Sequence, residues 1–379
     1  MAQDGLARAT ETAPRVRLME LAREYRTYKD DLLAACARVL ERMQLLGGDE
    51  LKAFEQEMAA YLGVEQVRGV ASGTDALDLA ARAAGLQPGD EVLIQSNAFM
   101  AAVEALVRVG TRPVPVDIRL ADLGPDVDDM AARITPRTRA IMVVHLYGFP
   151  VDLEPVMALA EAHDLILLED CSHAHGARYD GQCVGSFGAA GAFSLGVVKN
   201  LAAYGDAGMV ATNDPKLADT VKLLGTHGQL KKNEHAFYGG NSRLDELQAG
   251  MLRVKLRHLD TRNARRATIA AYYSEQLRGR AVPPPVDPRR THVYHQYVMR
   301  TARRDALRLY LHTLDIETGI HYPHPVHRQQ AWRATFGEHP ALPRAEQAAR
   351  EILSLPVHAD LSDTEVERVG DAVRWFFDG

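Results

Sequence analysis

The segment LILLEDCSHAHG, residues 165–176, decides the fold class of this chain. Its run of four apolar residues is typical of a short strand buried on both faces, and such strands belong to parallel sheets covered by helices. Ligands bind at the carboxyl ends of strands in open α/β sheets, so Asp170 and His173 are predicted at a ligand site. The alternative is an Asp170 that caps the next turn and a His173 that faces solvent.

The surrounding sequence repeats this alternation of short apolar strands and amphipathic helices. Strands are predicted at residues 90–95, 112–118, 139–148 and 165–170, and helices at 99–110, 126–134 and 153–164. Two earlier helices are predicted within residues 18–62, and the second begins at a capping Asp49 and ends at Gly63. The alternation predicts an α/β fold with a mainly parallel sheet between helices.

The C-terminal third of the chain has a different pattern. A long helix is predicted over residues 255–277 as a bridge, and AVPPPVDP at 281–288 breaks the chain after it. The segment that follows is shorter and mixes helix and strand patterns. At the other end of the chain, the first residues are small and polar. We therefore expect a flexible N-terminus over residues 1–17, a large domain over 18–255, and a linking helix with a small α+β domain over 256–379.

Composition and charge argue against several classes of protein. The 379 residues carry a net charge of −6, which gives no reason to expect a nucleic-acid partner. Cys36, Cys171 and Cys183 form neither a disulfide framework nor a metal-ligand spacing, and they fit a reducing compartment. The N-terminus has no signal-peptide core, and no apolar run is long enough to span a bilayer. The sequence predicts a cytoplasmic protein with no metal site and no membrane partner.

One lysine lies in GAFSLGVVKNLAAYGDAG, residues 191–208, among small and apolar residues. A desolvated amine has a lowered pKa and forms Schiff bases with carbonyl groups. Lys199 together with Asp170 at a strand end suggests a pyridoxal phosphate site, in which the cofactor is the electron sink and the carboxylate holds its pyridine nitrogen. Ser194 could add a hydroxyl to the phosphate. The alternative is a solvated surface lysine.

Two further segments offer groups for a ligand. In VASGTDAL, residues 70–77, Gly73 and Thr74 come just before a predicted helix, whose N-terminal N–H groups form an anion site. An ordinary capped turn between a strand and a helix explains the same pattern. In YGGNSRLDELQAGMLRVKLRHLD, residues 238–260, a Gly-Gly-Asn turn leads into a predicted long helix, and Asn241 offers a free amide.

Together these segments resemble one family. SGTDAL, EDCSHAHGARYDGQCVGSFGAAGAFS, VKNLAAYGDAGMVATND, GGNSRLDELQA and GIHYPHPVH occur in this order, and FEQEMAAYLG and SLPVHADLSDTEVERV also fit. From about residue 18 to its end, the chain resembles the DegT/StrS-type nucleotide-sugar aminotransferases. The resemblance implies pyridoxal phosphate, the aspartate-aminotransferase-like fold (fold type I) with a seven-stranded-type sheet and a smaller C-terminal domain, and a homodimer.

The resemblance also implies a role for each matching residue. Lys199 would hold the cofactor as a Schiff base and later move a proton, Asp170 would keep the pyridine nitrogen protonated, and His173 would lie near the cofactor ring. The other cofactor-binding residues implied are Gly73, Thr74, Phe99, Ser194 and, from the neighbouring subunit, Asn241. His321 and Tyr322 would face the sugar.

The expected reaction moves an amino group from L-glutamate to a keto-sugar nucleotide, with pyridoxamine phosphate formed during turnover. The later motifs look most like members that act at carbon 3 of a dTDP-linked keto-6-deoxyhexose, in antibiotic or surface-glycan pathways. Lys231 and Lys232 could meet the diphosphate of that substrate, although solvated loop lysines are an equal alternative. The chain departs from the family at QSNAF, residues 95–99, and at Gly196, so the pocket near the sugar is expected to be roomier or differently polar.

Three other functions stay open. A carbon-4 keto sugar or a keto-cyclitol could be the amino acceptor, or the chain could be a non-catalytic binding or regulatory relative. Related dehydratases that use pyridoxamine phosphate have His at the position of Lys199, which argues against that activity here.

Overall fold

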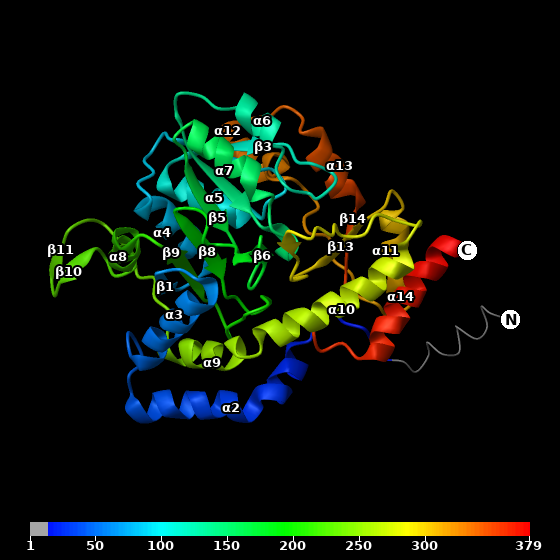
Figure 1. Ribbon diagram of the computed structural model, residues 1–379, viewed down its shortest axis with the longest axis horizontal. Helices are drawn as coiled ribbons and strands as arrows, with labels where there is room; N and C mark the ends of the chain where they lie inside the picture. Colours follow the sequence, from blue (N-terminus) through cyan, green and yellow to red (C-terminus); the bar gives the residue numbers. More distant parts are fainter. Residues whose placement is uncertain (1–13) are drawn as a thin grey trace.

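The computed structural model describes residues 14–379, and its centre is a seven-stranded sheet in the order β1-β9-β8-β5-β4-β2-β3 (Figure 1). The strands are β1 Gln66–Val70, β2 Glu91–Gln95, β3 Arg112–Val116, β4 Thr138–Val144, β5 Ile166–Asp170, β8 Ala190–Ser194 and β9 Gly208–Thr212. Strands β3, β2, β4, β5 and β8 pair in parallel, whereas β9 is antiparallel to both β8 and β1. The predicted α/β fold with a mainly parallel sheet is confirmed. The strand predicted to reach residue 148 ends earlier, at Val144, and a 3₁₀ turn, η1 Leu146–Gly148, follows it.

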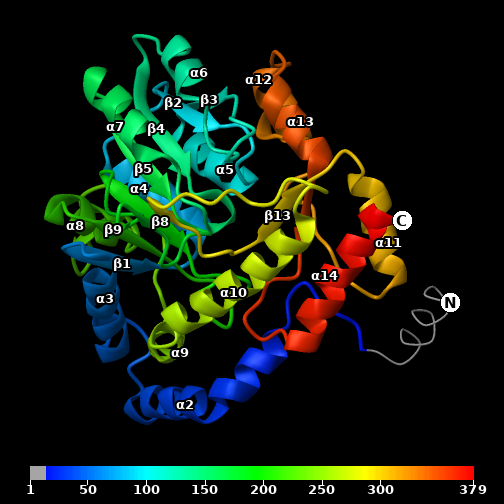
Figure 2. The ribbon, with the colours of Figure 1, turned by 45° about the vertical axis from the view of Figure 1, so that its right-hand side comes forward.

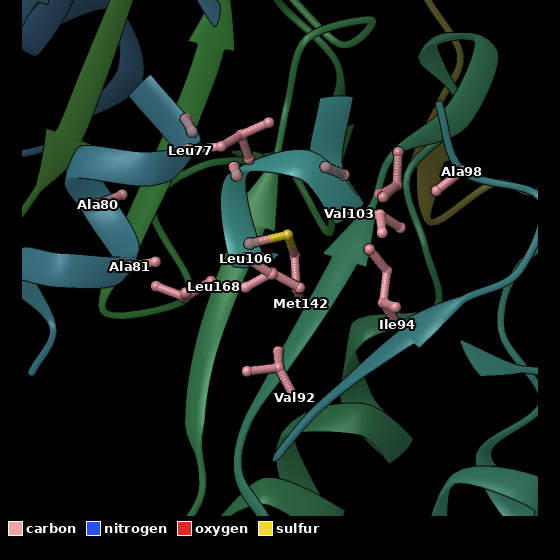
Figure 3. Packing of buried hydrophobic residues seen from close by; sticks show 14 of the residues in the cluster. Leu77, Ala80, Ala81, Val92, Ile94, Ala98, Val103, Leu106, Met142 and Leu168 are labelled. Carbon is pink, nitrogen blue, oxygen red and sulfur yellow. The ribbon is translucent and has the colours of Figure 1, made fainter. Parts of the chain in front are cut away.

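Helices cover both faces of this sheet. One face carries α4 Gly73–Ala83, α5 Met100–Val109 and α8 Pro215–Leu224, and the other carries α3 Asp49–Leu62, α6 Val127–Ala132, α7 Leu153–Ala162 and α9 Glu246–Leu256. Figure 3 shows the first face, where Leu77 of α4 and Leu106 of α5 lie near Met142 and Leu168 of the sheet. Burial of these apolar side chains stabilises both layers and fixes the positions of the strand ends.

The N-terminus of α3 differs from the prediction. Asp49 does not cap the helix, because Glu246 of α9 accepts hydrogen bonds from the N–H groups of Gly48, Glu50 and Leu51 at 2.5, 2.9 and 3.2 Å. A carboxylate from a distant helix therefore satisfies the free donors of this helix end. At the other end, Gly63 adopts the left-handed conformation with φ 73°, as the prediction requires.

The bridge to the C-terminal part consists of two helices. The helix predicted after the Gly-Gly-Asn turn of residues 238–260 begins at Glu246 and ends at Leu256, and α10 Leu259–Leu277 follows. Between them the N–H of His258 bonds to the carbonyl of Lys255, and the His258 ring stacks on Tyr28 with centroids 4.4 Å apart. In both ribbon views α10 then runs from α9 towards α14 Asp363–Asp378 (Figures 1 and 2).

A small sheet with its own helices forms the C-terminal part. Strand β13 Tyr297–Arg300 pairs antiparallel with β14 Ile352–Leu355, and both share a core with α10, α11 Arg304–Thr313 and α14. Helices α12 Gln330–Phe336 and α13 Pro343–Glu351 pack instead against the core of the large sheet, together with a 3₁₀ turn, η2 Val326–Arg328. The boundary at residue 256 stays a prediction.

Two small ribbons extend from the large sheet region. The first joins β6 Arg178–Tyr179, β7 Gln182–Cys183 and β12 Arg290–Thr291. The second is the hairpin of β10 Gln229–Lys231 and β11 Glu234–His235, which projects from the body of the molecule at the left of Figure 1.

The described beginning of the chain is attached to the C-terminal part, ahead of α2 Leu21–Arg42. Val16 is fully buried and bridges Ile316, and Arg368 donates a hydrogen bond to the carbonyl of Pro14. These contacts differ from the flexible segment expected over residues 1–17, of which residues 1–13 lie outside the described part. Over residues 14–379, no helix is both long enough and apolar enough to cross a membrane.

Candidate active site

A cavity lies where β4, β5 and β8 end, next to the N-terminus of α4. Parallel strands end at one edge of a sheet, so their following loops meet there. Seven of the residues predicted from the sequence line this cavity: Gly73, Thr74, Phe99, Asp170, His173, Ser194 and Lys199. The rest of the lining is Ser72, Leu77, Ala101, Val144, Leu146, Ser172 and Asp206.

Asp170 is the last residue of β5 and is 4% exposed. Its Oδ1 accepts the N–H of Ser172 at 3.0 Å, and among residues 14–379 no basic side chain lies within ion-pair distance of it. Burial raises the pKa of this carboxyl group, and the positive charge of Lys199 opposes that rise. A buried carboxylate in this state favours a ligand that brings a positive charge.

Lys199 lies in the turn after β8, where its N–H donates to the carbonyl of Gly196 at 2.9 Å. Burial of the amine lowers its pKa to about 8, and the nearby charge of Asp170 limits the decrease. The Lys199 amine is therefore partly neutral at physiological pH, as a Schiff-base lysine requires.

His173 is held in one tautomer by the backbone. The N–H of Tyr147 donates to its Nδ1 at 3.2 Å, so the neutral ring carries its proton on Nε2. Burial lowers the pKa of His173 well below its usual value, and the ring of His295 packs against it with centroids 4.3 Å apart. The cavity therefore contains a neutral imidazole with one N–H donor.

The N-terminus of α4 offers free donors to the cavity. Ser72 caps the helix by accepting the N–H of Asp75 at 3.1 Å, while the N–H groups of Gly73 and Thr74 have no partner within the described part of the chain. Strand β8 lies so close that a Cβ at Gly73 would be 2.4 Å from the Cβ of Ser194. Glycine is thus required there, and two N–H groups and one hydroxyl gather at a helix N-terminus that favours an anion.

Aromatic residues border the opening of the cavity. Phe99, just before α5, is half exposed, and its ring lies 5.1 Å from that of Tyr322. The hydroxyl of Tyr147 donates to the carbonyl of His321, whose Nδ1 is 2.8 Å from Oγ of Ser354. His321 and Tyr322 therefore lie next to the site, although neither lines the cavity itself.

Two predicted residues are not brought to the cavity by their own chain. Asn241 is exposed and forms a bridge with Thr226 at the surface. Lys232 is exposed in the turn of the β10–β11 hairpin, next to Lys231. If these residues contact a ligand in the predicted way, they do so in another copy of the chain.

The sequence analysis missed Glu169, which points away from Asp170 because neighbouring strand residues face opposite sides of a sheet. Its carboxylate accepts the N–H groups of Gly185, Phe187 and Gly188, and His145 Nε2 lies 3.0 Å from it. The N–H of Val151 donates to Nδ1 of His145, so Nε2 carries the proton. The two neighbouring acidic residues thus have different roles: Glu169 stabilises the buried side of the sheet, and Asp170 faces the cavity.

Glu169 also belongs to a group of possible metal ligands. Ligand atoms of His145, Glu169 and Cys171 lie within 4.8 Å of one another. The oxygens of Glu169 are already used by backbone donors, and burial raises the pKa of the Cys171 thiol well above its usual value. The group is explained as buried support for the strand end. Asp206, in the YGDAG motif, is a charged residue of the cavity lining that the sequence analysis also missed.

A lysine with a lowered pKa, a buried carboxylate and an anion site therefore lie together at one edge of a mainly parallel sheet. The chain belongs to the DegT/DnrJ/EryC1/StrS aminotransferase family, whose model matches residues 26–374. The family expected from the sequence motifs is confirmed, and with it an aminotransferase.

Known proteins of this family are similar over almost the whole chain. The dTDP-3-amino-3,4,6-trideoxy-alpha-D-glucose transaminase of Streptomyces venezuelae is 42% identical over 95% of this chain and 96% of its own length. The crystal structure of S. venezuelae DesV in complex with a ketimine intermediate superposes with a TM-score of 0.95 at 42% identity, covering 97% of this chain and all of that one. NtdA from Bacillus subtilis, with bound cofactor PMP, gives a TM-score of 0.90 at 27% identity, over 97% and 86% of the two chains.

Proposed function

We propose that this protein is a pyridoxal phosphate-dependent aminotransferase that moves an amino group from L-glutamate to a keto-sugar nucleotide. The observation that carries the proposal is the shared cavity of Asp170 and Lys199. The buried carboxylate has no cation within ion-pair distance in the described structure, and the amine has its pKa lowered to about 8. A protonated pyridine nitrogen and an aldehyde are the two partners that these groups accept.

Other features of the cavity fit the same cofactor. The N–H groups of Gly73 and Thr74 and the hydroxyl of Ser194 suit a phosphate, and Phe99 offers an aromatic face. When bound, the cofactor would supply an electron sink for the carbanion at the donor's α-carbon.

The residues of this chain would then share the remaining work. Asp170 keeps the ring nitrogen protonated, because its buried charge is stabilised by that proton. His173 would donate a hydrogen bond to the cofactor from its Nε2 N–H, in the tautomer that the N–H of Tyr147 fixes. The Nζ of Lys199 would take the proton from the α-carbon of the amino donor and pass it to the cofactor, and in the second half of the reaction it would carry a proton the opposite way, to the carbon of the acceptor.

The acceptor that we propose is a dTDP-linked 3-keto-6-deoxyhexose. The relative from S. venezuelae is named for a 3-amino product, and the sequence motifs indicate the same carbon. Gly196 leaves open space beside the lysine, since a Cβ there would meet only Oγ of Ser194 at 3.5 Å. This space is where the acceptor specificity of this chain can differ from its relatives.

We further propose a homodimer in which Asn241 and Lys232 reach the neighbouring cavity, Asn241 at the cofactor phosphate and Lys232 at the substrate diphosphate. Both residues are exposed, and neither lines the cavity of its own chain. A second copy could cover exposed apolar residues in two places. Leu230, Phe237 and Tyr238 lie near Lys232 and Asn241 in the sequence, and Leu33, Leu40 and Met43 lie on α2 or at its end.

The first test is the visible absorption spectrum of the purified protein with pyridoxal phosphate. A yellow protein that loses its colour with L-glutamate, and regains it with a dTDP-3-keto sugar, supports the proposal. Recovery only with a 4-keto sugar or a keto-cyclitol would assign the alternative acceptors. A protein that stays colourless would contradict the enzyme and favour a binding or regulatory relative, whose function would survive Lys199→Ala.

A further inference from the structure

A second cavity, of about 140 Å³, adjoins the active-site cavity, and both polar and apolar side chains line it. Its polar lining is Arg266 of α10, His295, Gln296, His321, Ser354 of β14 and His358. Leu18, Met19, Val198, Leu355 and Val357 complete the walls. His321, which is expected to face the sugar, borders this space, whereas no ligand is assigned to the other residues that line it.

The guanidinium of Arg266 is the unusual group in this cavity. Arg266 is 4% exposed, yet among residues 14–379 no carboxylate lies within ion-pair distance of it. Its Nη1 donates to the carbonyls of Tyr294 and Val357 at 3.2 and 3.4 Å, and no partner within the described chain is found for Nη2 or Nε. A buried cation without an anion is costly, so the site favours an anionic ligand.

The acidic residues nearest to Arg266 are engaged elsewhere. Glu24 pairs with Lys255, and Arg262 bonds to Asp360 at 2.6 Å and to Glu24 at 3.3 Å. Because these charges pair with one another, Arg266 has no carboxylate partner among the described residues near it.

Other polar groups of the cavity also lack partners. Oε1 of Gln296 and Nδ1 of His358 are buried and form no hydrogen bond within residues 14–379. The Gln296 amide can present either its oxygen or its nitrogen to a ligand, because the group turns by half a rotation. Together with the fork of Arg266, these groups can bind a carboxylate with two parallel N–H donors and further hydrogen bonds.

Residues that line the second cavity contact or adjoin residues that line the first. Val198 directly precedes Lys199 in the chain, and the ring of His295 packs on His173 with centroids 4.3 Å apart. The positive charge of Lys199 also acts on His295 and His321. A molecule that reacts at Lys199 can therefore place one end in the second cavity.

The size of the cavity indicates which end that is. Its volume corresponds to roughly four or five water molecules of the liquid, enough for a carboxylate and its neighbouring methylene groups. A substrate diphosphate would have to leave the cavity in two directions, towards the sugar and towards the nucleoside. A terminal carboxylate needs only one exit.

We propose that Arg266, with Gln296 and its neighbours, forms a subsite for a carboxylate of the amino donor. The inference rests on the proposed aminotransferase function and names the part of the site that holds the donor rather than the sugar. Arg266 binds this carboxylate through Nη2 and Nε while Nη1 keeps its backbone contacts.

The test uses the holoenzyme and glutarate, a dicarboxylate that cannot donate an amino group. Calorimetric titration should show binding of glutarate to the wild type and at least about tenfold weaker binding to Arg266→Lys, which keeps the charge but loses the fork. Arg265→Lys is the matched control, because the neighbouring Arg265 pairs with Asp363 outside the cavity. In the half-reaction with glutamate, Arg266→Lys should raise KM for glutamate and leave KM for the sugar nucleotide unchanged.

Several results would overturn the inference. These are equal glutarate binding by wild type and Arg266→Lys, an effect on the sugar nucleotide alone, or inorganic phosphate competing as well as glutarate, which would show a general anion site. If Arg266→Lys does not fold, Gln296→Leu and Ser354→Ala decide by the same titration. A wild type that binds glutarate through Arg266 but aminates no sugar would contradict only the proposed function, whereas normal turnover with an unchanged glutamate KM in the variants would contradict only this subsite.

Discussion

At the scale of single residues, the lowered pKa of Lys199 gives a measurable pH dependence. With a pKa of about 8 instead of 10.5, roughly one amine in ten is neutral at pH 7, compared with about one in three thousand for an ordinary lysine. Only the neutral amine attacks an aldehyde, so the rate of cofactor capture by the apoprotein should rise with pH, with a midpoint near 8. Stopped-flow absorption after mixing with pyridoxal phosphate measures this rate. A midpoint near that of free lysine would show that the amine is not desolvated.

Asp170→Asn should weaken cofactor binding. The substitution keeps the shape of the side chain but removes the buried charge that holds the pyridine proton, and we expect a loss of at least about a hundredfold in affinity, or about 3 kcal/mol. The same change removes the attraction that raises the pKa of Lys199, so the midpoint of cofactor capture should move to lower pH. Equilibrium dialysis and the pH profile check both effects. Asp219→Asn, exposed on α8, is the control and should alter neither.

Single-residue chemistry was the most predictable level. The strand-end position of Asp170 and the apolar setting of Lys199 are properties of the local sequence, and the structure brings both to one cavity. Arg266 and Gln296 could not be found in this way, because their cavity is formed by segments distant in sequence. Glu169 was missed because only the residue that faces the ligand, Asp170, was considered at the end of this strand, and its neighbour on the opposite face was not.

At the scale of elements, sequence patterns located the helices and strands but not all of their ends. The capping of α3 by Glu246 and the break before α10 depend on contacts with other helices, so local propensity gave a wrong cap at Asp49 and continuous helix across residues 255–260, where the structure has a break. Tertiary contacts override local preferences in such places. The strands were predictable because burial on both faces leaves a nearly continuous apolar run.

The cap on α3 can be tested by Glu246→Gln. The amide keeps the size of the side chain but accepts less strongly and points one NH₂ group at backbone donors, so we expect unfolding to be easier by about 2–3 kcal/mol. Urea denaturation followed by circular dichroism measures the change. The matched control is Glu41→Gln, an exposed residue of α2, which should change the unfolding free energy by less than about 0.5 kcal/mol. Equal stability of both variants would show that water replaces the Glu246 cap.

At the scale of the whole molecule, the site that we propose takes Asn241 from a second copy of the chain. The cavity of each chain holds Lys199 and Asp170, whereas Asn241 lies on the surface beside the projecting β10–β11 hairpin. Two-fold symmetry allows each chain to complete the site of the other, because an isologous interface repeats every contact twice. The fold class followed from the sequence pattern, whereas the expectation that Asn241 acts in the neighbouring subunit came from the family resemblance; the structure places Asn241 outside the cavity lining of its own chain.

Mixed dimers of Lys199→Ala and Asn241→Ala chains test this sharing. If Asn241 acts in the neighbouring site, each mixed dimer has one site with both substitutions and one site with neither. Unfolding and refolding an equal mixture should then restore roughly a quarter of the wild-type sites, because half of the dimers are mixed and each has one intact site. Glutamate-driven loss of colour per bound cofactor measures the recovery. Activity no higher than the average of the two separate variants would place Asn241 in its own chain's site or outside catalysis, and the monomer would then have to supply the missing phosphate contact itself.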